Sequence, residues 1–90
     1  MRETTLTLIN PLGLHFRAAS ELVNVTKRFA AEVIITHKEQ TIDGKSIMDL
    51  LLLGAEVGQE LHLRVEGEDE DASFDAICEL VQAGFNELED

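Results

Sequence analysis

Hydrophobic and polar residues alternate along four stretches of the chain, and alternation with a period of two predicts half-buried β-strands. These stretches cover residues 4–9, 32–37, 41–43 and 61–66. The turn-forming sequence Asn10-Pro11-Leu12-Gly13 ends the first stretch, and the polar sequence Lys38-Glu39-Gln40 separates the second from the third. The pattern therefore predicts four strands, two of them close together in the middle of the chain.

Helices are predicted between these strands. Residues from about 16 to 29 place one apolar face at intervals of three and four: Ala18, Ala19, Leu22, Val23, Thr26 and Phe29. Ser46 is a plausible N-cap for a second helix that runs to residue 53, with Asp49 arranged almost as in a capping box and Gly54 near the end. The acidic residues 69–71 suit the electropositive start of a third helix. Its expected buried stripe is Phe74, Ile77, Cys78, Val81 and Phe85.

The resulting order is β-α-β-β-α-β-α. Four strands with helices between them indicate an α+β fold with one mainly antiparallel sheet and its three helices on one face. A length of 90 residues fits a single domain, residues 1–90.

Charge limits the partners of this domain. The chain has seven Lys and Arg residues and 18 Asp and Glu residues, which gives a formal net charge of −11. Nucleic acid and anionic lipid are therefore not expected partners. Ten acidic residues and no basic one lie in residues 66–90, whereas Arg17, Lys27, Arg28 and Lys45 lie on or near the first two helices. We expect a dipolar molecule that presents a less negative face to an acidic partner.

The chain gives no sign of export or membrane insertion. One cysteine cannot form an internal disulfide, which fits a reducing compartment. No apolar signal-like run follows Met1, and the longest wholly apolar run, residues 50–53, is far shorter than the roughly 20 residues that cross a bilayer. The sequence therefore predicts a soluble cytoplasmic domain.

His15 is the leading candidate for chemistry because it immediately precedes the first predicted helix. The free N–H groups and positive dipole end of a helix N-terminus bind anions, above all phosphate, and favour a neutral, nucleophilic imidazole. Arg17, two residues on, would add a charge-assisted contact to a phosphoryl group. From these residues alone, a capping or solvent-facing histidine is the alternative.

Ser46 and the residues after it form the second candidate site. A hydroxyl at an N-cap is accessible to a kinase, and the helix dipole would tolerate the added phosphate; the alternative is a cap and nothing more. Six of the seven residues 47–53 are apolar, and a two-turn helix cannot bury its whole circumference. Some of Ile47, Met48 and Leu51 are therefore expected to form an exposed docking patch, with a crowded core as the alternative.

The other reactive side chains are assigned structural roles. His37 and His62 lie within predicted strands, and a surface or edge position is expected for each. They are not spaced as a metal site with each other or with Cys78, which is expected to be a buried structural thiol. We expect no metal and no cofactor.

Two motifs resemble those of the HPr family, the histidine-containing phosphocarriers of the bacterial phosphotransferase system. They are Gly13-Leu14-His15-Phe16-Arg17-Ala18-Ala19 and Gly44-Lys45-Ser46-Ile47-Met48, and the resemblance covers essentially all 90 residues. The predicted element order agrees with the open-faced β-sandwich of that family.

The resemblance implies that His15 accepts a phosphoryl group through Nδ1 from phosphorylated enzyme I and passes it to a IIA domain, with Arg17 as the cationic partner. Ser46 matches the serine that an ATP-dependent HPr kinase/phosphorylase modifies in that family. Ile47 and Met48 match its docking patch, and the expected docking surface also includes Phe16, Lys45 and Leu51. The chain would act as a monomeric, stoichiometric carrier and not as an enzyme.

Two positions depart from the family pattern. Phe16 stands where a small residue is usual, and Ala18 stands where proline is frequent. Phe16 either enlarges the apolar contact or partly shields the histidine. Two other functions stay open: a regulatory binding module of the same fold that is switched at Ser46, and a small hydrolase that uses His15 as a base.

Overall fold

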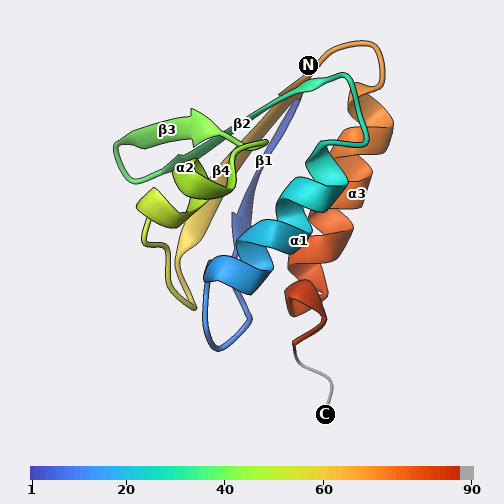
Figure 1. Ribbon diagram of the computed structural model, residues 1–90. Coiled ribbons are helices and arrows are strands. Elements are labelled where there is room, and N and C mark those ends of the chain that lie inside the picture. Colours follow the sequence, from blue (N-terminus) through green and yellow to red (C-terminus); the bar gives the residue numbers. More distant parts are fainter. Residues whose placement is uncertain (88–90) are drawn as a thin grey trace.

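The computed structural model describes residues 1–87 and arranges them as a sheet with helices on one side (Figure 1). The elements are β1 (Arg2–Thr7), α1 (Phe16–Thr26), β2 (Glu32–His37), β3 (Gln40–Asp43), α2 (Ile47–Leu52), β4 (Glu60–Glu66), α3 (Glu70–Gln82) and a 3₁₀ turn, η1 (Gly84–Asn86). The predicted element order is confirmed. No helix within these residues is long and apolar enough to cross a membrane.

The sheet has the strand order β1-β4-β2-β3, and all neighbouring strands run antiparallel. The last strand, β4, lies between β1 and β2, and its register pairs Val65 with Val33 and Leu63 with Ile35. All three helices cover the same face, so the predicted open-faced architecture is confirmed (Figure 1).

The core between sheet and helices is aliphatic. In β4, Leu61, Leu63 and Val65 are buried while the residues between them face outward, as the alternation predicted. From the helices, Leu22, Leu50 and Ile77 are almost completely buried against that face. Burying an aliphatic side chain of this size contributes about 1.5–3 kcal/mol relative to leaving it exposed.

Element ends differ from the predictions by two or three residues. The first strand ends at Thr7 because its partner β4 begins at Glu60, the residue opposite Thr7. Leu8 nevertheless continues the buried pattern, and its N–H donates to the Gln59 carbonyl. α1 ends at Thr26 instead of residue 29. The buried Thr26 hydroxyl donates to the Gly44 carbonyl over 2.9 Å, which fastens the end of α1 to the segment before α2.

The end of α3 is the largest departure. The helix ends at Gln82, so Phe85 is not on its stripe; it is buried because the chain reverses at Gly84, Phe85 and Asn86, all of which have positive φ. Cys78 lies on α3 but is half-exposed, so the expectation of a buried thiol is wrong. Partial burial, followed by the charge of Asp75, raises the pKa of this thiol.

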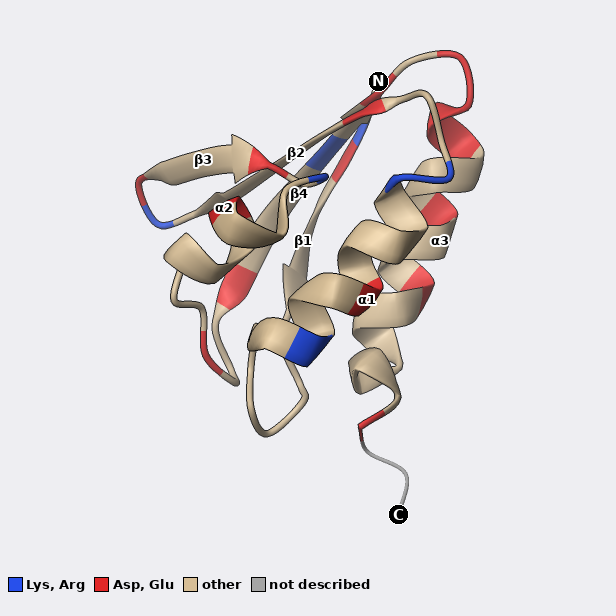
Figure 2. Cartoon of the chain, viewed as in Figure 1, with Lys and Arg blue, Asp and Glu red and all other residues tan. Residues whose placement is uncertain are grey.

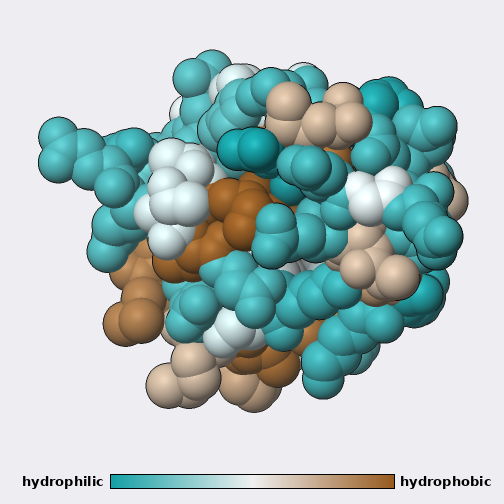
Figure 3. All heavy atoms as spheres, turned by 90° about the horizontal axis from the view of Figure 1, so that it is seen from above, coloured by the Kyte–Doolittle hydropathy of each residue, from teal (hydrophilic) through white to brown (hydrophobic). Residues whose placement is uncertain are grey.

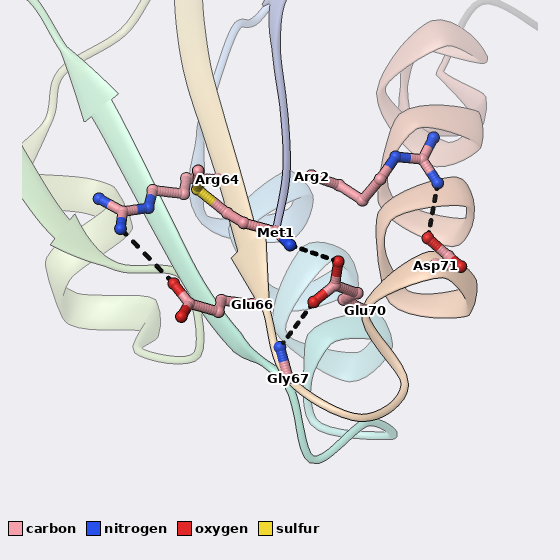
Figure 4. A network of polar contacts seen from close by, with 7 residues as sticks. All are labelled: Met1, Arg2, Arg64, Glu66, Gly67, Glu70 and Asp71. Carbon is pink, nitrogen blue, oxygen red and sulfur yellow. Dashed lines mark hydrogen bonds and ion pairs between the residues drawn. The ribbon is translucent and has the colours of Figure 1, made fainter.

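Ion pairs join the start of β1 to the start of α3 (Figure 4). The Met1 ammonium lies 2.6 Å from the Glu70 carboxylate, which also accepts the Gly67 N–H, and the Arg2 guanidinium donates to Asp71 over 2.8 Å. The hydrogen bond from the ammonium, followed by that from Gly67, lowers the pKa of Glu70.

Asp69 holds the loop before β2 against the start of α3. One carboxylate oxygen accepts the Ala30 N–H and the other accepts the Ala31 N–H, both over 2.8 Å. The Ala30 hydrogen bond is the main reason that the pKa of Asp69 is lowered. The charged carboxylate is therefore the form that the fold prefers.

Acidic residues are concentrated on α3 and the loop before it, whereas α1 carries a basic residue in its first turn (Figure 2). Part of the predicted acidic segment, residues 88–90, lies outside the described residues. Viewed from above, the end of the molecule where the chain starts is mainly hydrophilic around a small apolar area (Figure 3).

We expect Asp69→Asn to lower the melting temperature at neutral pH, because the carboxamide replaces one of the two accepting oxygens with an NH2 group, which is a donor and cannot accept the backbone N–H that faces it. The folded pKa is depressed, so the stabilisation is complete above the unfolded value of about 3.9 and is lost as pH falls through the folded pKa. The difference from wild type, measured by thermal circular dichroism, should therefore shrink in acid.

Glu68→Gln is the matched control, since it removes one charge from the adjacent exposed residue. An equal loss of stability in both variants would show that net charge, and not the Asp69 hydrogen bonds, sets the effect.

Candidate functional site

The turn that precedes α1 is held against the loop that follows α2. Gly13 has φ of +64°, and a Cβ at this position would lie 2.7 Å from the Ala55 carbonyl oxygen. The Leu14 N–H donates to that same oxygen over 3.0 Å, and the Leu14 side chain is buried. Only a residue without a side chain permits this approach, which fixes where α1 begins.

His15 is the N-cap of α1, as predicted, with an extended backbone and its carbonyl accepting the Ala19 N–H over 2.8 Å. Its side chain is about one quarter exposed, at 26 %. The first N–H groups of the helix, those of Phe16, Arg17 and Ala18, have no helical carbonyl before them to pair with. They supply a ready anion-binding position beside the imidazole.

A carboxylate that the sequence analysis did not identify contacts the histidine. The Nε2 atom of His15 is hydrogen-bonded to Oε2 of Glu87, whose side chain is only 12 % exposed. The second oxygen, Oε1, accepts from Nδ2 of Asn10 over 3.1 Å. The Asn10 side chain is completely buried in the turn before α1, so the histidine, the carboxylate and the amide form one connected group.

The ionisation of Glu87 decides which nitrogen of the ring is free. Burial opposes the charged carboxylate, but the hydrogen bonds from His15 and then Asn10 outweigh it and lower the pKa of Glu87. A carboxylate only accepts hydrogen bonds, so Nε2 carries the proton that the two groups share. In the neutral imidazole, Nδ1 then keeps its lone pair for chemistry.

Arg17 lies in the first turn of α1 with its side chain 77 % exposed, and within residues 1–87 it forms an ion pair with Glu21 at 4.0 Å. A contact of this length on an exposed side chain restrains it little. His15, Arg17 and Glu87 all line one surface pocket of about 590 Å³, together with Pro11, Leu12 and Asn86. The predicted histidine and arginine thus lie beside the same space, which is large enough for a phosphoryl group.

Ser46 is the N-cap of α2, as predicted, and its hydroxyl oxygen accepts the Asp49 N–H over 3.2 Å. The reciprocal half of a capping box is not formed, because the Ser46 N–H donates to the Asp43 carbonyl instead. The Lys45 ammonium donates to the Phe29 carbonyl over 2.8 Å. This predicted docking cation is therefore held toward the end of α1.

Several large apolar side chains in the loop before α1, at the first residue of α1, and on α2 are exposed. They include Leu12, Phe16, Met48 and Leu52. Met48 is 70 % exposed, as expected for a docking residue, whereas Ile47 and Leu51 are half-buried and pack against the core. Leu52, which the sequence analysis did not single out, is exposed in their place. Phe16 points outward and leaves the histidine accessible to the pocket.

The other histidines differ from one another. His62 is on the surface as predicted, with Nε2 2.8 Å from a Glu3 oxygen. The surface or edge position expected for His37 is wrong: it is buried, with Nδ1 3.2 Å from the Leu53 carbonyl and Nε2 3.2 Å from Gln59 Oε1. The alternation of β2 carried this signal, since His37 is in phase with the buried Val33 and Ile35. Residues 1–87 contain no cluster of three or more metal-ligating side chains.

Comparison with known proteins identifies relatives over almost the whole chain. Residues 2–83 match the family model described as the PTS HPr component phosphorylation site. The chain is 45 % identical over 85 residues to a phosphocarrier protein HPr from Pseudomonas aeruginosa, covering 93 % of this chain and 94 % of that protein. It is 41 % identical to a phosphocarrier protein NPr from Shewanella violacea, covering 94 % and 93 %.

A solved structure agrees with this result. The crystal structure of HPr-C-His from Thermoanaerobacter tengcongensis matches with a TM-score of 0.92 at 30 % identity, covering 96 % of this chain and 97 % of that one. The similarity therefore extends to the complete arrangement of strands and helices.

Proposed function

The chain belongs to the HPr family of phosphocarriers of the phosphotransferase system, and from this premise we propose that Nδ1 of His15 accepts a phosphoryl group from phosphorylated enzyme I and transfers it to a IIA domain. The chain acts in this scheme as a stoichiometric carrier, since it returns to its starting state only when the acceptor takes the phosphoryl group.

One observation carries the assignment: His15 is the N-cap of α1, and its Nε2 atom is occupied by Glu87. The remaining nitrogen, Nδ1, belongs to a ring that lines the surface pocket beside the unpaired N–H groups of the helix. Those groups and the dipole of α1 stabilise the negative oxygens of a phosphoryl group on that nitrogen.

Arg17 supplies the mobile cation in this proposal. Its guanidinium is exposed, lies in the same pocket and is not committed to a strong ion pair within residues 1–87. A charge-assisted contact from this guanidinium would stabilise the negative phosphoryl oxygens during transfer. The same contact is absent before the phosphoryl group reaches the pocket.

The proposed docking surface for both partners comprises Phe16, Met48 and Leu52, with Ile47, Leu51 and Lys45 at its margins. Exposed Met and aromatic side chains suit an interface that must fit two partners in turn. The proposal places this exchange in the cytoplasm. The proposal takes a single copy of the chain as the carrier.

Ser46 is proposed as a regulatory phosphorylation site for an HPr kinase/phosphorylase. Its hydroxyl is half-exposed at the start of α2, and Met48 in the docking surface lies two residues on. A phosphate there would place about −1.5 to −2 charges beside the apolar contact.

His15→Ala should abolish phosphoryl acceptance and leave the fold intact, because the side chain is partly exposed and outside the core. Incubation with enzyme I and phosphoenolpyruvate, read by intact mass, tests this. His62→Ala removes an exposed histidine from the sheet and should gain phosphate like wild type. Phosphate on the His15→Ala chain would refute the assignment, and a phosphate that resists acid would contradict a phosphoramidate.

Arg17→Ala should slow phosphoryl transfer while changing the free energy of unfolding by no more than about 0.5 kcal/mol, as is usual for exposed sites. Rapid-quench transfer assays and chemical denaturation measure the two effects. Arg64→Ala removes an exposed cation from the outer face of the sheet and serves as control. Normal transfer combined with a large loss of stability would assign Arg17 to the fold instead.

Ser46→Asp should weaken binding to enzyme I, most strongly at low salt, and leave the melting temperature unchanged or higher. Aspartate still caps α2 and adds a charge that its dipole favours by about 0.3–1 kcal/mol. Ser46→Asn is the matched control, since it caps without charge. Calorimetric titration at two ionic strengths measures binding; equal affinities for the two variants, or unfolding of Ser46→Asp, would count against regulation by charge at this position.

A further inference from the structure

We propose that Glu87 is a positioning residue for phosphoryl transfer, which it assists by holding the protonated Nε2 of His15 so that Nδ1 faces the incoming phosphorus. This inference rests on the proposed function, and it assigns a role to a carboxylate located 72 residues away in sequence.

The carboxylate is itself held in place. The buried Asn10 amide donates from Nδ2 to Oε1 of Glu87 over 3.1 Å and to the Gly13 carbonyl over 2.7 Å. Both partners are acceptors, so the amide must present its nitrogen to them, which settles its orientation. Asn10 thus connects Glu87 to the turn that sets the start of α1. The contacts place His15 and Glu87 in a fixed relation to one another.

The backbone before Glu87 supports the same interpretation. Gly84, Phe85 and Asn86 have φ of 64°, 55° and 64°, a left-handed run that costs energy for residues other than glycine. Such conformations persist only where surrounding contacts enforce them, and they gather at functional sites. The Phe85 side chain, 1 % exposed, anchors the reversal in the core. The chain thereby turns back from α3 toward the pocket and brings the carboxylate to the imidazole.

The arrangement matches the charge that transfer creates. The Nδ1 lone pair forms a bond to phosphorus while the bond between phosphorus and the donor breaks, and that electron pair stays with the donor. With Nε2 still protonated, the ring becomes cationic as the new bond forms. The Glu87 carboxylate accepts the Nε2 hydrogen bond and stabilises that positive charge, and the proton remains on Nε2.

Two other groups face the ring or the carboxylate. The Arg17 guanidinium is near enough for its charge to favour the ionised Glu87, and the Asn10 amide donates to it directly. Both keep Glu87 charged, which is the state that the stabilisation requires. Burial disfavours the charged Glu87 carboxylate, but the hydrogen bonds and nearby positive charge outweigh this effect and the pKa of Glu87 is lowered.

The test compares Glu87→Ala and Glu87→Gln with wild type in the full chain, using phosphorylated enzyme I as donor. A hydrogen bond to a charged group corresponds to a factor of about ten or more in a rate constant, so Glu87→Ala should slow acceptance by at least about tenfold. Glu87→Gln keeps an acceptor oxygen for Nε2 but lacks the charge, so it should fall between Glu87→Ala and wild type. Glu39→Gln, an exposed residue of the β2–β3 turn, controls for net charge.

Nitrogen-15 spectra of the His15 ring supply a readout that a purely structural role would not move. In wild type the neutral ring should be protonated at Nε2 with a slowly exchanging proton, and that protection should disappear in Glu87→Ala while the remaining amide spectrum stays near wild type.

Wild-type rates and an unchanged ring spectrum in either folded variant would overturn the inference. If Glu87→Ala does not fold, Glu87→Gln alone decides. Failure of the wild-type chain to gain phosphate at His15 would instead overturn the proposed function, so the two failures are distinguishable.

Discussion

The close approach of the Gly13 turn to the Ala55 carbonyl is the constraint on which the site depends. A Cβ at residue 13 would collide with backbone, which has no flexible end that could move aside. The approach lets the Leu14 N–H reach Ala55, and this bond fixes the residue at which α1 starts. His15 becomes the N-cap as a consequence, and the imidazole gains its position beside unpaired N–H groups without any dedicated binding loop.

Carboxylates carry much of the remaining architecture of this acidic chain. Asp69 accepts two backbone N–H groups and Glu70 accepts the Met1 ammonium and the Gly67 N–H, while Glu87 accepts from a ring and an amide. Each of these groups has a lowered pKa, because the donors around it favour the charged form. Part of the excess negative charge therefore stabilises the fold through these hydrogen bonds and ion pairs, in addition to making the surface repel anions.

The sequence predicted the elements because hydrophobic alternation and helical spacing are local signals. It placed His15 and Ser46 correctly as helix caps for the same reason. It missed features that depend on tertiary contacts: α1 stops early where Thr26 bonds to Gly44, and Phe85 is buried by a reversal of the chain. Glu87 could not be predicted as a neighbour of His15, since its place depends on left-handed backbone at Phe85, a residue type that seldom adopts this conformation, as well as at Asn86.

The fastening of α1 to the segment before α2 has a consequence for how information can pass between the two helices. The Thr26 hydroxyl donates to the Gly44 carbonyl, and the Lys45 ammonium donates to the Phe29 carbonyl. Two hydrogen bonds, one donated from each segment, therefore connect the end of α1 to the start of α2. A junction of this kind leaves α2 no free hinge on which to swing when its cap is altered. Phosphorylation of Ser46 would therefore act on a partner through a change in the local electrostatic potential, while the fold keeps its shape.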